Sequence, residues 1–231
     1  MSAKILVKFP TRNRPSIFLE TLRGYVERAS DLDNILFLVS YDADDKTMTD
    51  DVIIKAQSIA PNLNIKACKG NSKSKIEAVN ADLDKVSEAF KQWKIVLVVS
   101  DDMKCVNGKW DEIIRADMEE HFSDLDGYLW YYDGFQNRIS TIACMGRKYY
   151  DRFGYIYHPA YKSLWCDNEQ TEVANLLGKL KFLEDPIMIH DHPAWGGGMI
   201  NDALYIQNDK WWKHDEEVYN LRKKNNFPNE I

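Results

Sequence analysis

The 231-residue sequence contains no apolar run near the roughly 20 residues that a membrane-spanning helix needs. Residues 1–4 lead straight into a strand-like segment, without the apolar core of a signal peptide. Cysteine is scarce, and its four positions form no Cys-x-x-Cys pair: Cys68, Cys105, Cys144 and Cys166. Scattered cysteines favour free thiols in a reducing compartment. We therefore expect a cytoplasmic protein.

The sequence also lacks a surplus of positive charge. Lysine and arginine number 30 against 36 aspartates and glutamates, so the net charge is −6. A chain of this charge has no broad electrostatic attraction for nucleic acid. Hydrophobic residues make up 45% of the sequence and aromatic residues 12%, which excludes an intrinsically disordered chain. The composition is that of an ordinary globular protein.

Strand-like and helical patterns alternate over the first hundred residues. Short apolar runs predict four strands, at 4–9, 35–41, 63–67 and 95–99. Apolar residues at steps of three and four predict the helices between them. The first begins at Pro15, the second follows Thr49, and a long third runs from Ser72 or Ser74 to Phe90. Continuous apolar strands that alternate with helices predict an α/β fold, with a mainly parallel sheet covered on both faces.

The second half has a mixed α+β pattern. We expect helices over 110–121, 167–177 and 210–224, and strands over 127–132, 139–145 and 182–189. No linker-like segment separates the two halves. We therefore expect a single domain over residues 1–231.

Polar residues follow three of the predicted strands. The first strand leads into PTRNR at 10–14, the second into DADD at 42–45 and the fourth into SDD at 100–102. Ligands of open α/β sheets bind at the carboxyl ends of the strands, so these segments should meet at one edge. Carboxylates packed together need a cation, and a divalent metal that bridges to a phosphate-bearing ligand would meet this need. Ordinary hydrophilic turns, which Asp and Asn favour, are the alternative.

Five short segments carry a further pattern. KILVKFPTRNRP begins at residue 4, ILFLVSYDADD at 35, GNSKSKIEAVN at 70, VLVVSDDM at 96 and WCDNEQTEVA at 165. In order and spacing they resemble the GT-A-fold glycosyltransferases of the family 2 type, which use nucleotide-diphosphate sugars. The resemblance spans about residues 4–200. It implies a Rossmann-like GT-A fold, with a nucleotide-sugar-binding half at 1–103 and a mixed α+β, acceptor-binding half at 104–231.

The resemblance assigns nucleotide-binding residues in the first two segments. It places Pro10, Thr11 and Arg12 in the loop that contacts the nucleotide. Asp42 would accept a hydrogen bond from the base, which is most often uracil in this family, and Asp44 lies beside it in the same segment. UDP is therefore the nucleotide that the resemblance favours.

Further donor contacts are implied by the third and fourth segments. Lys73 and Asn80 would flank the ribose or the phosphates. Ser100 stands where the family has an Asp, which leaves its ribose contact in doubt, and Asp101 would reach the hydroxyls of the donor sugar.

The metal site implied by the resemblance centres on Asp102, the last residue of the family's Asp-x-Asp motif, which coordinates Mn²⁺ or Mg²⁺. Enzymes of this fold often add a histidine from the C-terminal half, and His190 and His192 are the candidates. Two residues apart in a strand, they would face the same side. The alternative is that one of them merely caps the end of the strand.

The catalytic base is implied to open the helix at 167–177. Inverting transfer needs a carboxylate that deprotonates the acceptor hydroxyl. Asp167 matches the family's position better, and Glu169 is the second candidate. The alternative for Asp167 is an ordinary N-cap, with Gln170 at the capping-box position.

The leading hypothesis is a metal-dependent, inverting hexosyl- or pentosyltransferase. It would move a sugar from a nucleotide diphosphate to a hydroxyl acceptor, either a glycan or a modified base in DNA. One alternative is a nucleotidyltransferase of similar fold, although the segment PTRNRP has no glycine where such enzymes carry a glycine-rich loop. The other is a non-catalytic nucleotide-binding module, which Ser100 keeps open.

Overall fold

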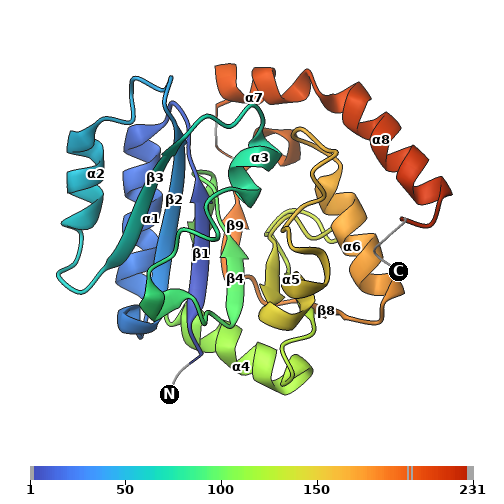
Figure 1. The fold of residues 1–231 in the computed structure, drawn as a ribbon, viewed down its shortest axis with the longest axis horizontal. Helices are drawn as coiled ribbons and strands as arrows, with labels where there is room; N and C mark the ends of the chain where they lie inside the picture. The colour runs from blue at the N-terminus through green and yellow to red at the C-terminus, as the bar shows by residue number, and fades with distance from the viewer. Residues whose placement is uncertain (1–2, 197, 199, 228–231) are drawn as a thin grey trace.

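The computed structural model describes residues 3–196, 198 and 200–227, and a seven-stranded sheet crosses its centre (Figure 1). The strands are β1 (Ile5–Pro10), β2 (Ile35–Asp42), β3 (Asn64–Gly70), β4 (Ile95–Val98), β6 (Tyr128–Tyr131), β7 (Cys144–Gly146) and β8 (Leu180–Leu183). They lie in the order β3-β2-β1-β4-β7-β6-β8. A separate antiparallel pair is formed by β5 (Met103–Cys105) and β9 (Met188–His190).

Most strands of the sheet run in one direction. β3, β2, β1 and β4 are parallel, and Ile5 of β1 is paired with both Ile35 and Ile95. Only β7 opposes its two neighbours, because it is antiparallel to both β4 and β6, whereas β8 is parallel to β6. The predicted α/β class, with a mainly parallel sheet, is confirmed.

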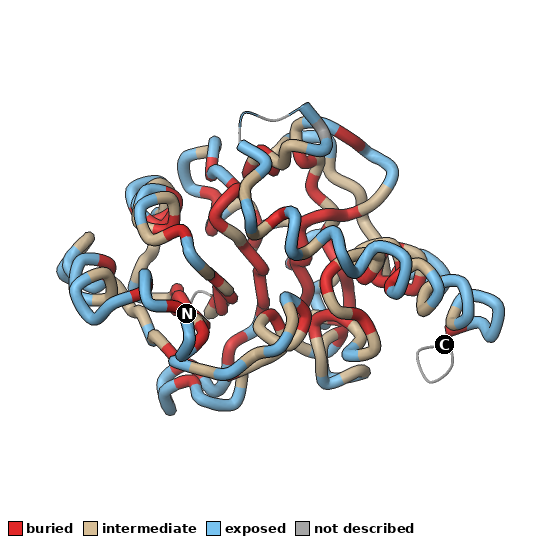
Figure 2. The backbone as a smooth tube through the Cα atoms, turned by 90° about the horizontal axis from the view of Figure 1, so that it is seen from above, coloured by how far each residue is buried: buried red, intermediate tan, exposed pale blue. Residues whose placement is uncertain are grey.

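Helices cover both faces of the sheet. α1 (Pro15–Arg28), α2 (Asp50–Gln57) and α4 (Trp110–Phe122) pack on the face to which the odd-numbered side chains of β1 point. α3 (Lys75–Asn80), α5 (Arg147–Phe153) and α6 (Cys166–Leu176) pack on the other face. β1, β2 and β4 are buried almost throughout, whereas β3 and β8 are mostly half-buried, and the outer sides of the helices are exposed (Figure 2). The central strands thus carry apolar residues on both faces, as their continuous apolar sequences predict.

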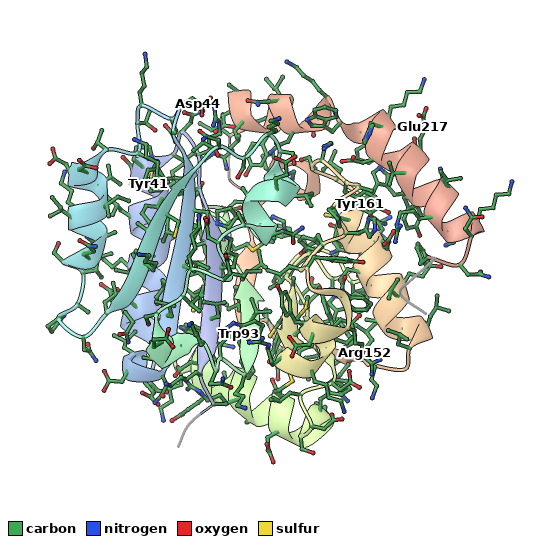
Figure 3. The ribbon with its side chains drawn as sticks, in the orientation of Figure 1. Tyr41, Asp44, Trp93, Arg152, Tyr161 and Glu217 are labelled. Carbon is green, nitrogen blue, oxygen red and sulfur yellow. The ribbon has the colours of Figure 1, made fainter. Side chains whose placement is uncertain are left out.

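Two further helices end the described chain. α7 (Ala203–Asp209) and α8 (Trp212–Lys224) run across the top and right of Figure 1. In Figure 3, Asp44, which follows β2, lies near α7, whereas Trp93, which precedes β4, lies at the opposite end of the sheet. α7 therefore sits at the carboxyl ends of the parallel strands, where ligands of such sheets bind.

The long helix expected up to Phe90 is wrong. Ser74 caps α3, with its hydroxyl accepting a hydrogen bond from the Glu77 N–H, but the helix ends at Asn80. The backbone is extended at Ala81 and left-handed at Asp82, which has a φ of 67°. Tertiary contacts of Asn80 and Asp82 outweigh the helical spacing, and Phe90 reaches the core from a short 3₁₀ turn, Glu88–Phe90.

Three expectations for the second half are corrected as well. The strand expected at 182–189 is two strands, β8 and β9, which belong to different sheets. The strand expected at 139–145 is confined to β7, and the helix expected at 210–224 begins at Trp212 and is preceded by α7. β5 and α5 were not foreseen. In the part of the chain that the structure describes, no helix combines the length and the apolar character that crossing a bilayer requires.

Candidate functional site

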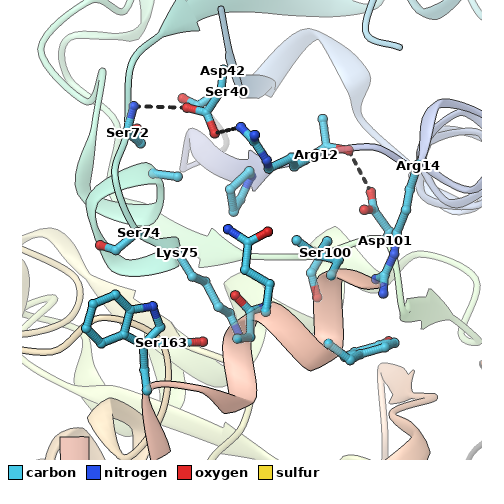
Figure 4. Close-up of a pocket in the computed structure, with 18 of the residues that line it drawn as sticks. Arg12, Arg14, Ser40, Asp42, Ser72, Ser74, Lys75, Ser100, Asp101 and Ser163 are labelled. Atoms are coloured by element: carbon cyan, nitrogen blue, oxygen red, sulfur yellow. Dashed lines mark hydrogen bonds and ion pairs between the residues drawn. The ribbon is translucent and has the colours of Figure 1, made fainter. Parts of the chain in front are cut away.

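A cavity of about 530 Å³ opens at the carboxyl ends of β1, β2 and β4 (Figure 4). This volume is ordinary for a small-molecule site, since such pockets span roughly 300–1,000 Å³. Its walls come from the loop after β1, the end of β2, the start of α3, the segment after β4, residues 163–164 and the region of α7. We call it the donor cavity.

Most of the predicted donor-site residues line this one cavity: Pro10, Thr11, Arg12, Asp42, Asp44, Lys73, Ser100, Asp101, Asp102 and His192. They come from segments up to 182 residues apart in sequence, counting from residue 10 to residue 192. Asn80, His190, Asp167 and Glu169 are not among its lining residues. Arg14 and Lys75 join the wall as further cations, so the cavity combines basic and acidic groups.

Arg12 ties two of the predicted carboxylates together. Its guanidinium donates to Asp42 Oδ2 at 2.8 Å and to both oxygens of Asp44, at 2.7 and 2.8 Å. The other oxygen of Asp42 accepts the Ser72 N–H at 2.9 Å. The hydrogen bonds from Arg12 hold the pKa of Asp44 below its ordinary value. Asp42 is thus fixed in place at the cavity wall, whereas Asp44 lies at its exposed rim.

The Asp101–Asp102 pair begins three residues after the end of β4 and is buried. Burial, together with the charge of Asp102, raises the pKa of Asp101 to about 8, and Thr11 Oγ1 donates to Asp101 Oδ1 at 3.1 Å. For Asp102, burial opposes ionisation, but hydrogen bonds from His190, Ser100 and Tyr205 outweigh it and lower its pKa well below the ordinary value. Ionising both of these adjacent carboxylates is unfavourable, so Asp101 is the neutral member of the pair and Asp102 the charged one.

Asp102 and His190 suit a divalent metal. His190 Nε2 lies 3.5 Å from Asp102 Oδ2, and a carboxylate oxygen with an imidazole nitrogen is a donor pair that Mn²⁺ accepts. Across residues 3–196, 198 and 200–227, no group of three or more His, Cys, Asp or Glu side chains could hold a metal ion. Asp102 and His190 could by themselves supply only two ligands of such an ion.

His192 has a different place from the one expected. Its Nδ1 accepts the Ala194 N–H at 3.1 Å and caps the short 3₁₀ helix Pro193–Trp195. Burial and the neighbouring His190 lower the pKa of His192 to about 4, so the ring is neutral. His192 thus caps a 3₁₀ helix and not the end of the strand, and it still lines the donor cavity.

α7 contributes residues that the sequence analysis missed. Tyr205 donates its hydroxyl to Asp102 Oδ2 at 2.7 Å, and its ring packs against His192 and beneath the Arg14 guanidinium. Arg14 in turn makes two hydrogen bonds of 2.8 Å to Asp202. Asp202 also caps α7 by accepting the N–H groups of Leu204 and Tyr205. An Asp before an apolar segment is an N-cap signal that could have revealed this helix.

A second cavity of about 280 Å³ adjoins the first and shares Leu164 with it. It is lined by Gln136, Arg138, Ile139, Leu164, Trp165, Asp167, Asn168 and Trp212. Trp165, and not Asp167, occupies the N-cap position of α6, so the capping alternative for Asp167 is wrong. Burial raises the pKa of Asp167, the direction that suits a proton acceptor working near neutral pH.

Glu169 and Asn80 are held elsewhere. Both oxygens of the buried Glu169 accept from Arg222, and Tyr161 donates its hydroxyl to Glu169 Oε2 at 2.7 Å. The Asn80 side chain bonds the backbone of Ile156 and Tyr157, accepting both N–H groups and donating to the Tyr157 carbonyl. Neither residue lines the donor cavity or the second cavity, so the structure does not bring them to the site.

Comparisons with known proteins bear on the fold. No model of a known protein family and no curated protein sequence matches the chain. The chain is similar to mannosyltransferase PcManGT from Pyrobaculum calidifontis in complex with GDP-Man and Mn²⁺, in a match that covers 80% of this chain with a TM-score of 0.62 and 14% identity. It is also similar to S. aureus TarS 1–349 in complex with UDP, in a match that covers 80% of this chain with a TM-score of 0.61 and 18% identity. The chain spans 55% and 59% of the lengths of these two structures. It has the Rossmann-like GT-A fold.

Proposed function

We propose that this chain is a metal-dependent, inverting glycosyltransferase that moves a sugar from a nucleotide diphosphate to a hydroxyl acceptor. One observation carries the proposal: most of the residues matching the family's donor motifs, though not Asn80, line the donor cavity, and Asp167 lines a second cavity that shares Leu164 with it. Donor and acceptor sites of such an enzyme must adjoin, because the acceptor hydroxyl attacks the anomeric carbon of the donor sugar.

The donor cavity has suitable groups for each part of a nucleotide sugar. Asp42 is fixed at the wall and would accept a hydrogen bond from the base. Arg12, Lys73 and Lys75 would face the diphosphate, whose charge needs cations. The proposal of a nucleoside diphosphate draws support from the fold neighbours, which bind GDP-Man and UDP.

Asp102 and His190 would hold the metal, which, when bound, supplies positive charge that stabilises the leaving diphosphate. The chain's own contribution is to keep Asp102 ionised and fixed. Its two oxygens accept from Ser100 and Tyr205, so the carboxylate has one orientation. Asp101, protonated below a pKa of about 8, could donate to a sugar hydroxyl instead of repelling the diphosphate.

Asp167 would act as the general base in the second cavity. Its carboxylate would take the proton of the acceptor hydroxyl as the bond to the anomeric carbon forms, a contribution of about 10²–10⁴ in rate. The rings of Trp165 and Trp212 line the same cavity with the amides of Gln136 and Asn168. This mixture of aromatic faces and amides suits a glycan acceptor.

The first test is donor binding. The purified chain is heated with UDP, GDP and their sugar conjugates, with and without Mn²⁺, and compared with Asp102→Ala. A ligand at 100 times its dissociation constant adds about 2.7 kcal/mol, which is a clear rise in melting temperature. The proposal expects a shift with one nucleotide that depends on metal, vanishes in Asp102→Ala and persists in Asp126→Ala, whose carboxylate pairs with Arg152 away from both cavities. No shift with any nucleotide contradicts the proposed donor site.

A further inference from the structure

Asp215 of α8 is completely buried and holds three consecutive backbone amides. The Lys162 N–H donates to its Oδ1 at 3.0 Å, and the Ser163 and Leu164 N–H groups donate to its Oδ2 at 2.8 Å each. His214 Nδ1 lies 2.8 Å from the same Oδ1. Hydrogen bonds to an ionised carboxylate are shorter and stronger than neutral ones. The backbone of residues 162–164 is therefore fixed by a side chain that comes about 50 residues later.

Residues 162–164, which we call the partition, end in Leu164, the residue that both cavities share. Ser163 and Leu164 line the donor cavity, and Leu164 also lines the second cavity. Trp165 follows in the left-handed region, with a φ of 61°, and turns the chain into α6, where Asp167 faces the second cavity. A shift of the partition would therefore move Asp167 relative to the donor.

The partition is also bonded to the start of α3, which forms the neighbouring part of the wall of the donor cavity. The Lys162 carbonyl accepts the Ile76 N–H at 3.2 Å, and Lys162 Nζ lies 3.7 Å from Glu77 Oε1. The other oxygen of Glu77 accepts the N–H of Lys73, a residue of the cavity wall, at 2.8 Å. Figure 4 shows Ser163 on the side of the cavity where Ser74 and Lys75 lie. The start of α3 and the partition are thus one hydrogen-bonded unit.

We propose that Asp215 is a positioning residue, which sets the partition so that Asp167 faces the sugar held in the donor cavity. It touches neither substrate and acts through the backbone of residues 162–164. The expected effect of Asp215 on sugar transfer rests on the proposed function. In the proposed function the nucleotide would lie mainly against the ends of β1, β2 and β4, where Arg12 and Asp42 are bonded to each other. We therefore expect its affinity to depend less on Asp215 than transfer does.

The chain offers a matched control. Asp111 of α4 is also completely buried, and it accepts the Ser30 N–H at 2.7 Å, the Ser30 hydroxyl at 3.0 Å and the Asp31 N–H at 3.1 Å. It lines neither cavity. Asp111→Asn and Asp215→Asn both remove a buried carboxylate that accepts backbone N–H groups, and Asp111 in addition pairs with Arg115 Nη1 at 2.6 Å. Only Asp215 supports the partition.

The test measures hydrogen exchange, nucleotide affinity and transfer on the full chain and both variants. In Asp215→Asn, we expect the amides of 162–164 to exchange at least tenfold faster and the kcat of transfer to fall at least tenfold, with the nucleotide Kd within threefold of wild type. In Asp111→Asn, we expect unchanged exchange at 162–164 and unchanged kcat. If Asp215→Asn does not fold, the same measurements are made on Asp215→Glu, which moves the carboxylate by one methylene. The same changes in exchange and kcat are expected.

Two results would overturn the inference. One is wild-type exchange at 162–164 in the Asp215 variant, and the other is a kcat that falls no more than in Asp111→Asn. A wild-type chain that binds no nucleotide and transfers no sugar contradicts the proposed function instead. In that case the exchange measurement still decides whether Asp215 fixes the partition.

Discussion

The hydroxyl of Tyr205 donates a 2.7 Å hydrogen bond to Asp102 Oδ2, which joins α7 to the segment after β4. Both residues line the donor cavity. The bond places a tyrosine beside the carboxylate that the proposed metal would use, so we expect α7 and metal binding to depend on each other.

Replacing Tyr205 by phenylalanine tests this dependence. We expect Tyr205→Phe to lower the free energy of unfolding by about 1–3 kcal/mol, because a buried carboxylate oxygen loses its donor. Mn²⁺ with nucleotide should recover part of the loss by binding that oxygen. Urea unfolding with and without Mn²⁺ measures both. In the control Tyr219→Phe, which loses a bond to Glu172 Oε2 outside both cavities, the loss should not respond to metal.

Asp42 and Asp44 share the guanidinium of Arg12 but differ in exposure, which makes them a comparison pair. We expect Asp42→Asn to weaken nucleotide binding about tenfold, equivalent to about 1.4 kcal/mol, because a charged acceptor for the base is lost. Asp44→Asn should change the Kd less than threefold, since this side chain lies at the exposed rim. Calorimetric titration with UDP measures both. Equal losses in the two variants would contradict the role of Asp42.

Asp167 and Glu169 lie two residues apart on α6, and we expect replacement of the first to lower the transfer rate and replacement of the second to lower stability. Asp167→Asn should keep donor binding and lose about 10²–10⁴ in transfer rate, as a general base does. Glu169→Gln should instead destabilise the chain by about 3–5 kcal/mol, because it breaks a buried pair with Arg222. Transfer assays normalised to folded protein separate the two. Near-normal turnover in Asp167→Asn would exclude it as the base.

Lys8 predicts a pH dependence of stability. It is buried in β1, where its ammonium donates to Ser40 and to the Ala81 carbonyl, and burial lowers its pKa to about 8. The unfolded chain holds this proton up to its ordinary pKa of 10.5, so the contribution of Lys8 to the free energy of unfolding should rise with pH between about 8 and 10.5. The rise is at most about 3 kcal/mol.

The Lys8 prediction is checked by urea unfolding across this pH range. The free energy of unfolding of wild type minus that of Lys8→Met should grow with pH over this range, whatever the absolute stability of the variant. The same difference taken with Lys85→Met should not grow, because Asp82 raises the pKa of Lys85 and moves its effect to higher pH. A pH dependence that is the same in Lys8→Met and wild type would contradict the assignment to Lys8.

Sequence patterns predicted the central strands, because each of them is a continuous run of apolar residues. The apolar runs of β1, β2 and β4 identify central strands, and Asp42 and Asp102 could be placed at the site because each follows such a strand. The family motifs then supplied the order of the cavity residues. Physical reasoning from neighbours in sequence was sufficient at these positions.

Contacts between distant segments decided the rest. The end of α3 depends on Asn80 bonding residues 156–157, and the position of Tyr205 depends on Arg14 and Asp102. Asp215 looks like a helix N-terminal acid in the sequence, yet its partners are three amides of another loop. Such pairings leave no periodic signal, so neither the length of α3 nor the partition could be inferred.

The place of β7 between β4 and β6 has a consequence for synthesis on the ribosome. β4 ends at Val98 and pairs on one side with β1, but its other edge must wait until residues 144–146 have been made. Until then the nascent chain carries an open, wholly apolar strand edge of the kind that pairs with other chains. Aggregation during translation should therefore be greatest for chains stalled between β4 and β7.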